Sequence, residues 1–165
     1  MGFDLEQGDW IAPYGKGIVG DIFFTYTAKP DAWVFKMECT NAWDGFFRRP
    51  ADKWSGFYSG YEAPTNGYQP VVIQTIDETK RPTFDDHVRD GELLVFRMRT
   101  AVNGQGKLVD ARYGKIYGEI QFGTGRLPYI RFKYYYNSAG TRNLEFDPKS
   151  NLFTNLPSLN RVYQP

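Results

Sequence analysis

Apolar residues recur at every second position through most of this chain, and this period of two limits what the chain can fold into. Ile130, Phe132 and Tyr134, for example, alternate with Arg131 and Lys133, and no window of about 11 to 18 residues carries the stripe of an amphipathic helix. Successive side chains of a strand point to opposite faces, so the pattern predicts strands with one buried face. The expected strands are 17–27, 32–39, 68–76, 92–102, 107–112, 115–122, 129–136 and 143–146.

Short glycine- and asparagine-containing turns separate the later strands, which is typical of an antiparallel meander. The length of 165 residues corresponds to one domain at about 100 to 200 residues per domain. We therefore expect residues 1–165 to form a single all-β domain, an antiparallel β-sandwich of the jelly-roll kind, with a closed β-barrel as the alternative. The side chains expected in the core are Ile22, Phe24, Phe35, Met37, Phe96, Met98, Ile120, Phe122, Ile130, Phe132 and Phe146.

The charges nearly balance, with 20 Lys and Arg against 19 Asp and Glu. Such a chain creates no strong field that would attract nucleic acid or an anionic membrane, so we expect no nucleic-acid partner. No run approaches the roughly 18 apolar residues of a membrane helix, and we expect no membrane span.

Residues for nucleophilic or metal chemistry are scarce. The chain has one histidine, His87, and one cysteine, Cys39, which falls in an apolar alternating stretch and is expected to be an inert buried thiol. Asp85, Asp86 and Asp90 follow one another without the spacing of a calcium-binding EF-hand loop, which favours a solvated acidic loop. We expect no metal, no cofactor and no catalytic triad.

A glycine pattern of the G-x-G-x-x-G form occurs at Gly15, Gly17 and Gly20. Such a pattern binds a pyrophosphate where it opens a helix, but here an alternating β-branched and aromatic run follows it. Dinucleotide binding is therefore not expected.

Two acidic residues, Glu38 and Glu119, are expected on outward strand faces. A pair of such carboxylates could serve a glycoside hydrolase, although cross-strand ion pairing explains each of them equally well.

Alternation predicts outward strand faces that carry both charged residues and tyrosines. Phe, Tyr and Trp together make up 18% of the chain. Tyr117, Tyr129 and Tyr135 share the outward positions of adjacent strands with Arg131, and such a platform can stack on sugar rings or on a protein surface. The alternative is that these tyrosines only stabilise the sheet.

The segment 41–68 carries eight large aromatic rings without clean alternation, and loops of this length usually have a function. If the segment is a lid, all of its rings are buried. If it is a binding loop, Trp54, Tyr58 and Tyr61 are the expected ligand contacts, because Gly56 and Gly60 keep the backbone between them open.

The stretches Tyr113–Gly118 (YGKIYG) and Arg142–Phe153 (RNLEFDPKSNLF) resemble a motif of uncharacterised, exported, all-β bacterial proteins. The resemblance covers about the last third of the chain. It implies a bacterial source and a periplasmic or extracellular location, and it transfers no functional residue.

The sequence thus predicts a non-catalytic binding domain of an exported bacterial protein, which recognises a glycan or a protein surface through exposed aromatic rings. The alternative is a carbohydrate-active hydrolase that uses the outward carboxylates.

Overall fold

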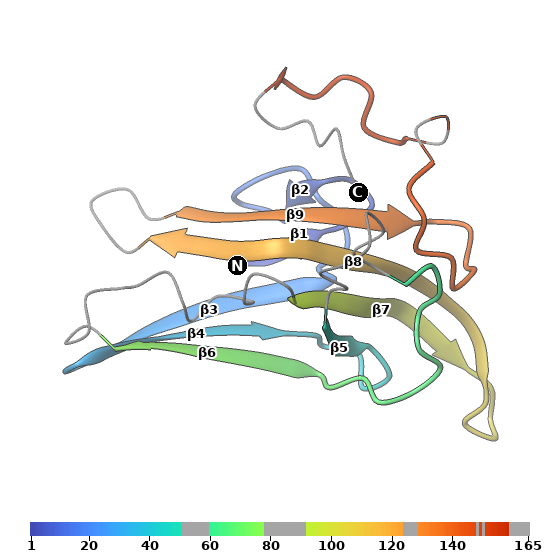
Figure 1. Cartoon of the computed structure of the whole chain (residues 1–165), viewed down its shortest axis with the longest axis horizontal. Coiled ribbons are helices and arrows are strands. Elements are labelled where there is room, and N and C mark those ends of the chain that lie inside the picture. The colour runs from blue at the N-terminus through green and yellow to red at the C-terminus, as the bar shows by residue number, and fades with distance from the viewer. Residues whose placement is uncertain (51–59, 78–91, 124–128, 148, 150, 159–165) are drawn as a thin grey trace.

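The computed structural model describes residues 1–50, 60–77, 92–123, 129–147, 149 and 151–158, which form two facing antiparallel sheets (Figure 1). The five-stranded sheet has the order β2-β1-β3-β4-β6, and the four-stranded sheet has the order β5-β7-β8-β9. The sheets do not close, so the β-sandwich prediction is confirmed and the barrel alternative is wrong. The strands are β1 (Gly2–Asp4), β2 (Asp9–Trp10), β3 (Ile22–Lys29), β4 (Ala32–Glu38), β5 (Gly45–Pro50), β6 (Val71–Asp77), β7 (Glu92–Val102), β8 (Leu108–Gly123) and β9 (Tyr129–Asn137).

The facing sides of the two sheets share one hydrophobic core. Cross-strand registry aligns Phe24 with Met37 and Met37 with Val72, and the Phe35 ring stacks on Phe122 of the opposite sheet at 4.5 Å. Seven of the predicted core residues are buried, namely Ile22, Phe24, Phe35, Met37, Phe96, Met98 and Ile120. Phe122, Ile130 and Phe132 are partly buried and pack against them.

A second apolar layer covers the outer face of the four-stranded sheet. Leu93 and Val95 of β7, which alternation assigns to the outward face, are fully buried beneath Ala63 and Leu144. The prediction that Phe146 lies in the inter-sheet core is wrong, because its ring packs on this outer face. Segments far from β7 in the sequence supply this cover, so a period of two could not reveal it.

Four strand predictions differ from the structure. The expected strands 107–112 and 115–122 are one continuous strand, β8, and 143–146 is not a strand, although Asn143 forms an isolated bridge with Glu62. The first predicted strand begins at Ile22 rather than at residue 17. Strands β1, β2 and β5 were not predicted, because two- and three-residue strands carry no readable period and β5 begins with consecutive buried residues.

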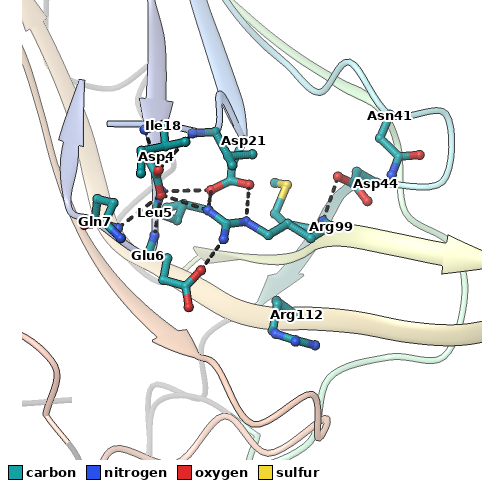
Figure 2. A network of polar contacts seen from close by, with 12 residues as sticks. Asp4, Leu5, Glu6, Gln7, Ile18, Asp21, Asn41, Asp44, Arg99 and Arg112 are labelled. Carbon is teal, nitrogen blue, oxygen red and sulfur yellow. Dashed lines mark hydrogen bonds and ion pairs between the residues drawn. The ribbon is translucent and has the colours of Figure 1, made fainter. Parts of the chain in front are cut away.

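One guanidinium joins the two sheets (Figure 2). Arg99 of β7 donates to both carboxylate oxygens of Asp21, at 2.9 and 3.0 Å, and to Asp4 Oδ1 at 2.8 Å. It also pairs with Glu6. The side chains of Asp4 and Asp21 are only 1% exposed and belong to the opposite sheet and its connection. Buried carboxylates need such a partner, so Arg99 stabilises the contact between the sheets at this edge.

Asp4 is fixed from several directions at once. Burial alone would raise the pKa of Asp4, but hydrogen bonds from the backbone of Val19, Ile18 and Gln7, together with the charge of Arg99, outweigh it and hold the pKa below its usual value. The hydrogen bond to Asp21 in turn raises the pKa of Arg99 further above its usual range.

Arg99 occupies a bulge in β7, where the pairing with β8 shifts register between Met98 and Ala101. Its φ of 53° lies in the left-handed region, which costs a non-glycine residue about 1 kcal/mol or more. The Asp44 carboxylate accepts the N–H groups of Arg99 and Thr100, each at 2.9 Å, and this cap stabilises the bulge. Burial raises the pKa of Asp44.

Replacing Arg99 should destabilise the fold. We expect Arg99→Met to lower the free energy of unfolding by about 3–5 kcal/mol, because it leaves Asp4 and Asp21 buried without their cation. Arg112→Met is the matched control, since Arg112 pairs with the exposed Asp110 and should cost less than about 1 kcal/mol. Equal urea midpoints for the two variants would contradict the role assigned to Arg99.

The lowered pKa of Asp4 makes the stability of the fold depend on pH. The pKa of Asp4 in the folded protein lies below its unfolded value of 3.8, so the ionised carboxylate stabilises the fold at pH values above 3.8. This contribution is lost as the pH falls below about 4. Asp4→Asn should therefore be less stable than the wild type at pH 7, with a difference that narrows in acid. Urea titrations across this pH range measure the difference, and a constant gap would exclude a lowered pKa.

Candidate functional site

The outer face of the four-stranded sheet brings the predicted platform residues together. Registry pairs Tyr117 with Lys133, Tyr135 with Lys115, Arg131 with Gln121, and Tyr129 with Gly123. The residues between them on β9, among them Ile130 and Phe132, face the core. Tyr117, Tyr129, Arg131 and Tyr135 therefore share one face, but their exposure differs along it.

One end of this face is covered. The Phe146 ring meets Tyr135 edge-on at 5.5 Å, and the amine of Lys115 lies 5.1 Å from the centroid of Tyr135 on the neighbouring strand. Lys115 is only 2% exposed, and burial lowers the pKa of its amine to about 8 against the opposing charge of Glu145. Burial also raises the pKa of Tyr135 to about 12. This end of the predicted platform is part of the second apolar layer.

The other end of the face is open. A Cβ at Gly123 would meet the Tyr129 ring, Cδ1 at 2.9 Å and Cζ at 3.0 Å, so the ring lies against the backbone of β8. Tyr129 is nevertheless 52% exposed. Arg131 and Lys133 are exposed beside it, and neither has a hydrogen bond or an ion pair with the described part of the chain. An exposed ring on the same face as two cations is suited to stacking and to hydrogen-bond donation.

The aromatic segment 41–68 contributes both cover and an exposed ring. Ala63 is buried, and the Tyr68 hydroxyl donates to the Pro64 carbonyl at 2.8 Å beneath the guanidinium of Arg97. Tyr61 is 66% exposed while its carbonyl accepts the N–H of Leu144. Trp43 is 47% exposed as well, so the expectation for a lid, that every ring of the segment is buried, is not met. Trp54 and Tyr58 lie outside the described residues.

The residues considered for catalysis do not form a site in the described part of the chain. Glu38 pairs with Lys36 at 2.7 Å, the surface ion pair that its spacing allows. Burial raises the pKa of the Cys39 thiol, which contacts the sulfur of Met98 at 3.7 Å and agrees with an inert thiol. The side chain of Glu119 and the residues His87, Asp85, Asp86 and Asp90 lie outside what is described, and no metal-binding group occurs among the described residues.

The inner face of the five-stranded sheet carries a feature that the sequence pattern does not reveal. Tyr26 and Trp33 contact each other at 5.3 Å between ring centroids, and Tyr26 is 43% exposed. Gln74 shares this face through its pairing with Phe35 and is only 6% exposed. Neither polar atom of its amide has a hydrogen-bond partner within the described ranges. Alternation places Tyr26 on the same face as the buried Phe24 and so predicts a buried ring, which is why the sequence did not reveal its exposure.

The fold is that of an antiparallel β-sandwich with an exposed tyrosine and two exposed cations on its four-stranded sheet. Comparisons of the chain with protein-family models, with curated proteins and with solved structures gave no match. No helix among the described residues is long and apolar enough to cross a membrane.

The amide of Gln74 gives a stability prediction. Gln74→Leu should raise the free energy of unfolding by about 1–2 kcal/mol, because leucine fills a similar volume and needs no hydrogen bond in a buried environment. The exposed Gln7 provides the control, and Gln7→Leu should change stability by less than about 0.5 kcal/mol. A Gln74→Leu variant less stable than the wild type would mean that the amide is hydrogen-bonded in solution.

Proposed function

We propose that this chain is a non-catalytic glycan-binding domain, with the open end of the outer face of the four-stranded sheet as its binding surface. The observation that carries the proposal is the Tyr129 ring, which lies against Gly123 and is still half exposed. An exposed tyrosine ring offers an apolar face on which a sugar ring can stack.

The chemistry around Tyr129 suggests the kind of sugar. Arg131 and Lys133 supply only hydrogen-bond donors and positive charge, and both are exposed on the same strand. A uronic acid or a sulfated sugar carries the complementary negative charge, and guanidinium groups bind carboxylates and sulfates in paired hydrogen bonds. The preferred ligand is therefore an acidic glycan rather than a neutral one.

The cellular setting belongs to the same proposal. A domain that binds acidic glycans would act where such polymers occur, outside the cytoplasm, and the resemblance of Arg142–Phe153 to exported bacterial proteins supports a periplasmic or extracellular location. In the structure Arg142 donates to the Ala63 carbonyl at 3.0 Å, and Leu144 is buried, so this stretch fixes the cover of the sheet rather than the ligand surface.

A glycan array followed by titration tests the binding surface. We expect binding to acidic glycans, and we expect Tyr129→Ala to raise the dissociation constant by about tenfold, the usual loss at an aromatic binding residue. Tyr14→Ala is the matched control, because Tyr14 is 66% exposed but lies in a different part of the fold, and it should bind like the wild type.

Two results would overturn the proposal. Equal losses of glycan affinity for Tyr129→Ala and Tyr14→Ala would show that the sheet face is not the binding site. Hydrolysis of the bound polysaccharide would show an enzyme instead of a binding domain. Binding to neutral glycans alone would agree with stacking on Tyr129 but contradict the role given to Arg131 and Lys133.

A further inference from the structure

The connection between β2 and β3 presents apolar side chains to solvent. In this segment, residues 12–20, the exposed fraction is 80% for Ile18, 66% for Tyr14 and 42% for Val19. Single exposed apolar residues are common on protein surfaces, but here two adjacent β-branched residues and a tyrosine lie within six positions. We call this segment the β2–β3 loop.

The loop is held in place by carboxylates from the neighbouring strands. Asp4 Oδ2 accepts the N–H groups of both Ile18 and Val19 at 2.9 Å, and Asp9 Oδ2 accepts that of Lys16 at 2.9 Å. Figure 2 shows Ile18 beside Asp4, at the edge of the Arg99 network. The apolar side chains are therefore exposed on a fixed loop and not on a freely moving one.

The glycine pattern explains how the loop packs. A Cβ at Gly17 would lie 2.8 Å from the Asp9 carbonyl oxygen, and a Cβ at Gly15 would collide with the Asp9 side chain. At Gly20 it would collide with the ring of Phe23. The pattern that resembles a phosphate-binding motif thus serves close packing of the loop against β2 and β3.

Most of the backbone N–H groups of the loop donate hydrogen bonds within the protein. Besides the three N–H groups bound by carboxylates, Gly17 donates to the Trp10 carbonyl at 2.9 Å and Tyr14 to the Ile11 carbonyl at 3.1 Å. Five of the six N–H groups from residue 14 to residue 19 therefore have partners. These hydrogen bonds hold the backbone of the loop beside β1 and β2, so its exposed side chains keep their positions.

We propose that the β2–β3 loop inserts Ile18 and Val19 into the interface of a lipid bilayer, with Tyr14 and Lys16 at the level of the headgroups. Tyrosine prefers the membrane interface, and a lysine can extend its amine to the headgroups while its stem stays apolar. The apolar side chains drive the insertion, so a net charge of +1 does not oppose it. The fixed loop needs no ordering on binding.

Co-sedimentation with sucrose-loaded vesicles tests the insertion. The purified chain is mixed with vesicles of phosphatidylcholine and with vesicles that also contain phosphatidylserine. We expect the wild type to sediment with both, and more with the second because of Lys16. The double variant Ile18→Ser, Val19→Ser should lower the partition coefficient by at least about tenfold, since each side chain loses most of its transfer free energy.

The matched control is Ile73→Ser, because Ile73 is also an exposed isoleucine, at 57%, but lies on the flat outer face of β6. It should partition like the wild type, and unchanged urea midpoints should show that all variants fold. Lys16→Gln should reduce sedimentation only with phosphatidylserine present, and less so at high salt.

Absence of sedimentation with either vesicle, or an equal loss for Ile73→Ser, would overturn the proposal. A photo-crosslinker at position 18 that captures a protein while the vesicles bind nothing would also overturn it, and would identify the loop as a contact for a protein partner.

Discussion

The pairing of Arg99 with Asp4 and Asp21 is the interaction on which the other polar features of this sandwich depend. The two carboxylates are buried at an edge of the five-stranded sheet, and the guanidinium reaches them from β7 of the other sheet. Buried carboxylates without a cation would cost several kcal/mol, so Arg99 stabilises this arrangement of the sheets. The strained bulge that directs Arg99 across the gap is in turn capped by Asp44.

Asp4 connects this internal network to the surface. One carboxylate oxygen accepts from Arg99, and the other accepts from Ile18 and Val19 in the β2–β3 loop. The conformation of that loop therefore depends on Asp4, which also forms the buried ion pair with Arg99. The surface around Tyr129 has a different origin, because it depends only on the registry of β8 with β9. The two proposed surfaces are thus positioned by separate interactions, and a change in one need not disturb the other.

Alternation in the sequence predicted the inner core and the shared face of the tyrosines well. It placed Phe24, Phe35 and Phe96 inside, and it put Tyr129 and Tyr135 on one side of β9. It could not tell these two tyrosines apart. Tyr135 is covered by Phe146, which approaches from beyond the end of β9, whereas Tyr129 is 52% exposed. Burial on an outward face depends on distant segments, and the period of a strand contains no information about them.

The sequence by itself determined the all-β class, the antiparallel pairing of the later strands and most of the residues that face the inner core, because side-chain direction in a strand follows from local geometry. Only the tertiary structure decided that Arg99 is a link between the sheets and not an outward surface charge. The same holds for the glycine pattern, which allows a loop to pack closely against its neighbouring strands. In both cases the partners, Asp4 and Asp21 for Arg99 and Asp9 for Gly15 and Gly17, are brought close by pairing between strands that the sequence signals too weakly to predict.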